Sequence, residues 1–139
     1  MRTVSIALAA AAAATAAVSA GAPAHADPGW VTFVFSPSTW NLSQVWGPHD
    51  QASTEQTAMS ACRNAGASDC QIVASSGDCA AFVKNGDSWN AATGLSAPVA
   101  VFGAAQGLGI PPGTTKTASE CSWDPVQPGT RVTWPYAGP

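Results

Sequence analysis

The chain has 139 residues and a formal net charge of −3. It contains no run of Lys or Arg, so it lacks the electrostatic footprint of a nucleic-acid-binding protein, and the same deficit argues against binding to anionic lipid. Four cysteines and six tryptophans in so short a chain indicate a small domain stabilised by cross-links and large aromatic side chains.

Residues 1–26 predict a secretory signal peptide. Arg2 gives a positive start, residues 4–18 are apolar and rich in alanine, and Ala24-His25-Ala26 fits a cleavage site. The alternative, a membrane anchor, needs about 20 strongly apolar residues, more than this run supplies. Cleavage leaves residues 27–139 as one secreted domain without a membrane attachment. This segment has four basic and eight acidic residues, a net charge of −4.

The first half of the domain predicts the order strand, strand, helix, strand. Val31, Phe33 and Phe35 alternate with Thr32 and Val34, which is typical of a strand with one buried face. The remaining expected elements of this half are a strand at 40–46, a helix from Gln51 to Gly66 with Asp50 as its N-cap, and a short strand at 72–74.

The second half predicts the same order. Strands at 80–83 and 89–93 flank Asn85-Gly86, a dipeptide typical of a two-residue hairpin turn because both residues accept positive φ. Ser96 is expected to cap a helix that ends near Gly107, and a turn-rich loop at 110–120 should lead to a strand opened by Cys121. A C-terminal hairpin strand at 130–134 is expected at a sheet edge.

The two halves also match residue by residue. Residues 33–41 lie over residues 82–90 at a constant offset of 49, and both segments contain Phe-Val followed by Trp-Asn. The alternative is chance similarity in a chain rich in Ala, Ser and Gly. We therefore expect an α+β fold: a small disulfide-linked domain with an antiparallel sheet and two helices, internally duplicated in halves of about 30–76 and 79–124.

Four cysteines allow three connectivities. Cys62 is expected at the end of a helix and Cys70 at the start of the next strand, so the two can meet across that corner. Cys121 has no such partner in its own half, because Leu108 occupies the place that matches Cys62. The expected bonds are therefore Cys62–Cys70 and Cys79–Cys121.

Several segments resemble the domain-of-unknown-function family 4189, small exported proteins common in mycobacteria and related bacteria. The resemblance covers most of residues 30–123 and is carried by residues 33–39, 58–62, 68–73 and 79–82. It implies export, a compact disulfide-linked α+β domain and a role at the bacterial surface or toward a host. The family supplies no catalytic residues, and its second helix often ends in a cysteine that this chain lacks.

The sequence contains no assembled catalytic, cofactor or metal motif. His49 is the only histidine beyond the predicted leader, and the adjacent Asp50 is needed as a helix cap, so a catalytic pair is not expected. The carboxylates are scattered singly, and several lie at expected caps or turns. We predict a protein that is not an enzyme and has no cofactor and no metal.

Trp40 and Trp89 are the candidate partner-binding residues, because they occupy matching places just after the two hairpin turns. They could form a paired aromatic surface or fill the core. The leading hypothesis is a secreted binding or effector module that contacts an unknown protein or envelope partner. The alternatives are an exported hydrolase acting on the cell envelope and a structural component of the envelope.

Overall fold

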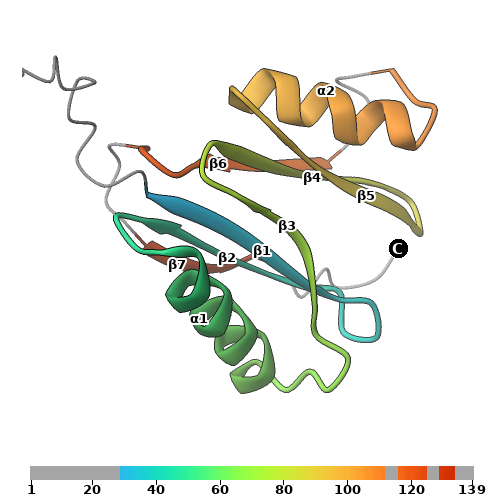
Figure 1. The fold of residues 1–139 in the computed structure, drawn as a ribbon. Coiled ribbons are helices and arrows are strands. Elements are labelled where there is room, and N and C mark those ends of the chain that lie inside the picture. The colour runs from blue at the N-terminus through green and yellow to red at the C-terminus, as the bar shows by residue number, and fades with distance from the viewer. Residues whose placement is uncertain (1–28, 112–115, 125–128, 134–139) are drawn as a thin grey trace, which may run out of the picture.

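The computed structural model describes residues 29–111, 116–124 and 129–133. They form four layers, in which a helix, two sheets and a second helix are stacked in that order (Figure 1). The α+β class and the antiparallel pairing expected from the sequence are confirmed, with the strands divided between two sheets. The predicted signal peptide at 1–26 lies outside the described residues.

Seven strands and two helices follow one another in the described part of the chain. The first half comprises β1 (Trp30–Ser36), β2 (Asn41–Gly47), α1 (Gln51–Asn64) and β3 (Gln71–Ser76). The second half comprises β4 (Cys79–Asn85), β5 (Ser88–Gly94), α2 (Ala97–Gly107) and β6 (Lys116–Cys121), and β7 (Gly129–Thr133) follows.

The two halves have the same topology. The sheets have the orders β3-β1-β2-β7 and β5-β4-β6, so in each half the first strand lies between the second and the third. The last strand lies at a sheet edge, as predicted, but it pairs with β2 of the other sheet instead of forming a hairpin with β6. The prediction of a hairpin strand is wrong because the edge of β2 offers backbone donors and acceptors that β7 can pair.

The main core lies between the sheets and contains Phe33 and Phe35 from β1 and Phe82 from β4. Thr32 and Val34, on the opposite face of β1, are also fully buried. Val34 packs in a second cluster that includes Ala58 of α1. The expectation of a single buried face is therefore wrong, because helix α1 covers the face that alternation had assigned to solvent.

Two local predictions in the second half are corrected. Residues 116–120 of the expected loop form β6 together with Cys121, which ends this strand instead of opening one. Little apolar alternation marks β6, since Ala118 is its one residue that packs against the main core. The β4–β5 turn consists of Gly86 and Asp87, one residue later than predicted, because Asn85 pairs with Ser88 and Gly86 takes the positive φ of 59°.

The cysteines form the two bonds expected from the sequence. Cys62 in the last turn of α1 is bonded to Cys70, the residue before β3. Cys79 and Cys121 are bonded across directly opposite positions of β4 and β6. The first bond fixes a helix to a strand and the second fixes two neighbouring strands.

Candidate binding surface

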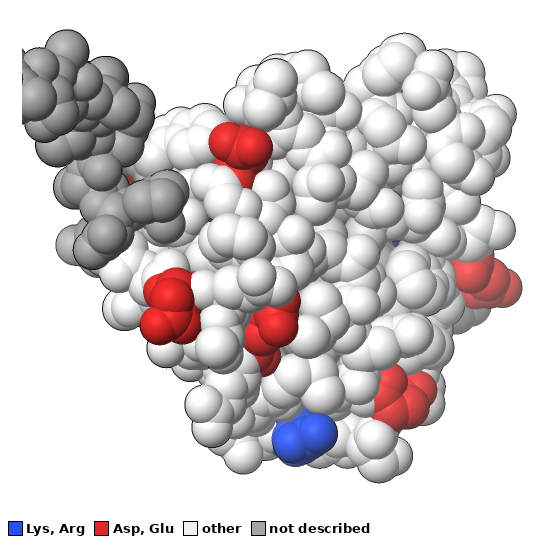
Figure 2. Space-filling model, viewed as in Figure 1, with Lys and Arg blue, Asp and Glu red and all other residues white. Residues whose placement is uncertain are grey.

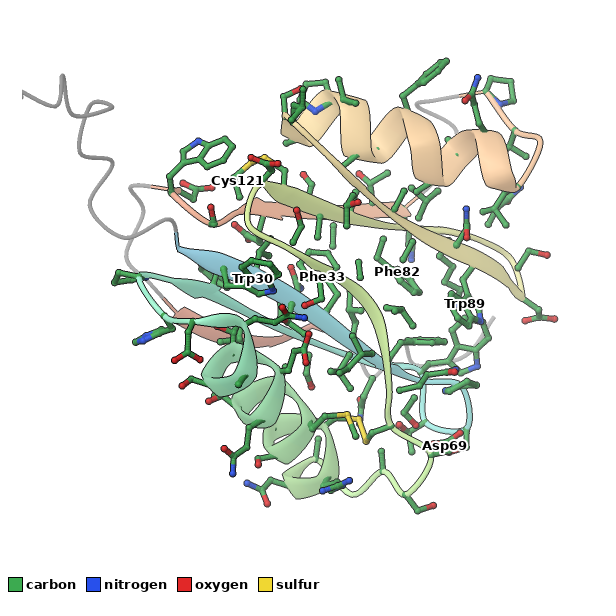
Figure 3. The ribbon with its side chains drawn as sticks, viewed as in Figure 1. Trp30, Phe33, Asp69, Phe82, Trp89 and Cys121 are labelled. Atoms are coloured by element: carbon green, nitrogen blue, oxygen red, sulfur yellow. A yellow bond between two sulfur atoms is a disulfide. The ribbon has the colours of Figure 1, made fainter. Side chains whose placement is uncertain are left out.

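Trp40 and Trp89 lie at the same end of the molecule and pack on one shared ring. The ring centroid of Phe35 is 5.4 Å from that of Trp40 and 4.7 Å from that of Trp89. Trp89 also stacks on Phe82 at 5.6 Å, between the two sheets (Figure 3). Both indoles are half-buried against the main core. The structure thus brings the two residues together, mainly as partly buried side chains that pack against the main core.

The two tryptophans occupy different backbone positions despite their matching sequence places. Trp40 lies in the β1–β2 turn, which spans residues 37–40, whereas Trp89 is the second residue of β5. The β4–β5 turn is two residues shorter, so the register of the hairpins aligns Trp89 with Leu42. Trp40 has a φ of 58°, which is uncommon for a residue with a Cβ atom and marks a locally constrained turn.

A cation of the chain itself covers Trp40. The Nζ atom of Lys84 lies 3.9 Å from the centroid of the Trp40 ring, and the Lys84 side chain is only 7% exposed. A cation over an aromatic face is a stabilising arrangement, and it occupies the surface that a ligand would otherwise use. Lys84 of β4 therefore helps to hold the β1–β2 turn in place.

Asp69 holds the β1–β2 turn against the segment that precedes β3, as Figure 3 shows. Its carboxylate accepts hydrogen bonds from the Ser36 hydroxyl, from the Ser38 hydroxyl at 2.7 Å and from the Ser38 backbone N–H at 2.9 Å. These donors, the Ser36 hydroxyl first among them, lower the pKa of Asp69 to about 2. An exposed carboxylate with this set of donors serves to fix a turn.

His49 and Asp50 lie exposed at the start of α1. The Asp50 carboxylate accepts the Ser53 backbone N–H at 2.7 Å and so caps the helix as predicted. This hydrogen bond is the main cause of the lowered pKa of Asp50, and the charge of His49 is a lesser one. No group of three His, Cys, Asp or Glu residues that could hold a metal ion occurs in the described part of the chain.

The outer face of α2 exposes an apolar stripe. Val99 and Phe102 lie three residues apart on one side of the helix and are 54% and 50% exposed. Leu95, which precedes the N-cap of α2, is 78% exposed. Residues 88–115 contain no Asp, Glu, Lys or Arg, and the surface over α2 at the upper right of Figure 2 is white. We call Leu95, Val99 and Phe102 the α2 stripe.

The inner face of α2 packs closely on β5. Gly94 of β5 leaves no room for a Cβ atom, which would lie 2.7 Å from the Ala100 backbone nitrogen. The Asn90 side chain donates to the Ala104 carbonyl at 3.0 Å, and a Cβ on Gly107 would collide with the same amide. The fully buried residues of this helix are all alanines, and its larger apolar residues are partly buried or exposed.

Helix α1 presents a different outer surface. The exposed side chains of this helix are nearly all polar or charged, among them Gln51, Gln56, Ser60 and Arg63. The α2 stripe was not predicted from the sequence, although a helix with no polar face inside a charge-free segment is a signal for it. Both helices were predicted, but not the difference between their outer faces.

The geometry defines the class: a small α+β domain with two disulfides and an exposed apolar helix face. Residues 30–122 match the model of the family described as "Domain of unknown function (DUF4189)". The chain belongs to this family, as the resemblance in the sequence indicated. No curated protein and no solved structure matches the chain. Neither helix in the described residues has the length and apolarity needed to span a membrane.

Proposed function

We propose that the chain is an exported, non-catalytic binding module that contacts an extracellular or envelope protein through the α2 stripe. The observation that carries this proposal is the exposure of Val99 and Phe102 on a helix without a charged residue, with the exposed Leu95 just before its N-cap. Apolar side chains that are half or more exposed and aligned on one rigid element are typical of protein-binding surfaces. The partner surface should be apolar and uncharged where it meets the stripe.

Two features support export, and a third supports a binding role. The leader at 1–26 has the pattern of a signal peptide. The chain contains two disulfides, which persist in oxidising compartments. The carboxylates of Asp50 and Asp69 are both engaged in fixing backbone, which supports a binding role over acid–base chemistry.

In this proposal Trp40 and Trp89 support the binding surface from a distance. Trp89 belongs to β5, the strand on which α2 packs, and its ring is held by Phe35 and Phe82. Phe102 is expected to contribute most to the interface, because a large aromatic side chain in an apolar contact contributes about 2 kcal/mol or more to binding.

The test is a capture experiment with the oxidised mature protein immobilised and offered purified envelope and host extracellular proteins. Phe102→Ser should reduce the retained partner at least about tenfold, whereas Gln56→Ser on the outer face of α1 should leave it unchanged. Equal retention by both variants would contradict the proposal. The same partner must then be shown to bind the purified chain directly.

The rival functions have separate tests. An envelope hydrolase that uses His49 would release soluble fragments from purified envelope, and His49→Ala would abolish that release. A structural envelope component would remain with the wall fraction after washing at high salt. The binding module should instead be recovered in the medium and should release no fragments.

A further inference from the structure

The outer edge of β5 is open where the matching edge in the first half is closed. Strand β2 lies between β1 and β7. Strand β5 is its topological counterpart, and among the described strands it pairs only with β4. No described strand therefore fills the place beside β5 that β7 fills beside β2.

The register shows which backbone groups point out of this edge. Cys79 and Cys121 are directly opposite with a Cα–Cα distance of 4.0 Å, which is typical of an antiparallel pair without mutual hydrogen bonds. The N–H and C=O groups of Cys79 therefore point toward its β5 partner, Gly94. Because this pattern alternates, the backbone groups of Trp89, Ala91 and Thr93 point away from β4.

The edge of β5 also lacks the devices that usually protect an exposed strand, which are charges, proline and bulges. Strand β6 carries Lys116 and Glu120, and β7 carries Arg131. Strand β3 pairs with β1 through an irregularity between Phe33 and Val34. Strand β5 has no charged residue or proline, and its register with β4 is continuous.

We propose that a second copy of this chain pairs antiparallel with the β5 edge, so that two three-stranded sheets become one continuous sheet of six strands. The outward groups are symmetric about Ala91, so Ala91 would face its own counterpart and Trp89 would face Thr93. A strand that pairs in this way with the same strand of a second copy forms a closed two-fold dimer, and no free edge remains at the contact.

Charge favours a second copy at this edge. Each mature chain carries a net charge of −4, so copies repel one another unless they meet where charge is absent. The charge-free residues 88–115 include both β5 and the helix packed on it. A two-fold axis perpendicular to the sheet places both α2 helices on the same face, so the dimer would present two α2 stripes to one partner. Only this last consequence rests on the proposed function.

The short strand predicts a weak dimer, with a Kd of about 10 µM to 1 mM, because a seven-residue contact buries less than a standard interface. Sedimentation equilibrium of the oxidised mature protein across this concentration range should show a monomer–dimer equilibrium. Thr93 is exposed and its N–H points outward, so Thr93→Pro removes one donor of the new ladder from each chain and leaves the β4 ladder intact. This variant should weaken the dimer at least about tenfold, while Thr93→Val, which keeps the N–H, should not.

Amide chemical shifts of the wild type provide a second readout that needs no variant. On dilution, the shifts of Trp89, Ala91 and Thr93 should change with the dimer fraction, while those of β3 should not. A monomer at every concentration, or a dimer whose shifts change only outside β5, would overturn the pairing. Neither result would affect capture of a partner by the α2 stripe, so the two proposals can fail separately.

Discussion

The two halves of this domain have one topology but differ in what they leave on the surface. In the first half, α1 turns polar side chains outward and β7 closes the edge of β2. In the second half, α2 exposes Val99 and Phe102, and β5 has no described neighbour on its outer side. The two halves thus share a topology but differ in the composition of the outer helix face and in the pairing of the outer strand edge.

The halves also differ in how they are cross-linked, and this gives the largest expected effect. Cys79–Cys121 closes a loop with a sequence separation of 42, against 8 for Cys62–Cys70. In the chain-entropy model, removal of Cys79–Cys121 lowers the free energy of unfolding by about 4 kcal/mol, and removal of Cys62–Cys70 by about 2.6 kcal/mol. Urea denaturation of the Cys79→Ala/Cys121→Ala and Cys62→Ala/Cys70→Ala proteins measures both values. A larger loss from the second pair would contradict this order.

The close approach of α2 to β5 can be tested with a single added carbon. Gly94→Ala should lower the free energy of unfolding by about 2 kcal/mol, because the new Cβ would lie 2.7 Å from the Ala100 backbone nitrogen. Gly103→Ala is the matched control. Its Cβ would lie 3.3 Å from the Ala92 side chain, and alanine favours the helix by about 1 kcal/mol, so little net change is expected. A Gly94→Ala variant as stable as the wild type would show that the helix lies farther from the sheet.

The smallest expected effect concerns the β1–β2 turn, which is two residues longer than the β4–β5 turn. Asp69→Asn removes the charge that the Ser36 and Ser38 donors stabilise, so the variant should melt at a lower temperature than the wild type at pH 7. The folded pKa of about 2 is below the ordinary value of 3.8, so the contribution is present above pH 3.8 and is lost as the pH falls through about 2. The difference in Tm should shrink over this window. A constant difference from pH 7 to pH 2 would assign the effect to shape and not to charge.

Most of the secondary structure could be predicted because its signals are local. Asp50 and Ser96 cap the two helices as expected, since the side-chain oxygen of each accepts a backbone N–H three residues on. The cysteine pairing could be predicted from the element order, because Cys62 and Cys70 flank a single corner. The caps and the Cys62–Cys70 bond depend on residues close together in the sequence, and the Cys79–Cys121 bond then followed by elimination.

The arrangement of the strands could not be predicted in the same way. Whether β7 pairs with β6 or with β2 depends on which edge is open after the sheets have stacked, and no local signal encodes this. The positions of Trp40 and Trp89 were mistaken for equivalent ones, because a constant offset ignores two extra residues in the first turn. The apolar composition of α2 could be read from the sequence. Which of its apolar side chains are exposed depends on how α2 packs on β5, and this required the structure.

Amide hydrogen exchange in dilute solution tests most directly whether the halves differ as described. Every residue of β2 from Leu42 to Trp46 pairs with both β1 and β7, so its amides should be uniformly protected. In β5, the amides of Asn90 and Ala92 should be protected by β4, whereas those of Trp89, Ala91 and Thr93 should exchange much faster. Uniform protection across β5 in the monomer would contradict an open second half.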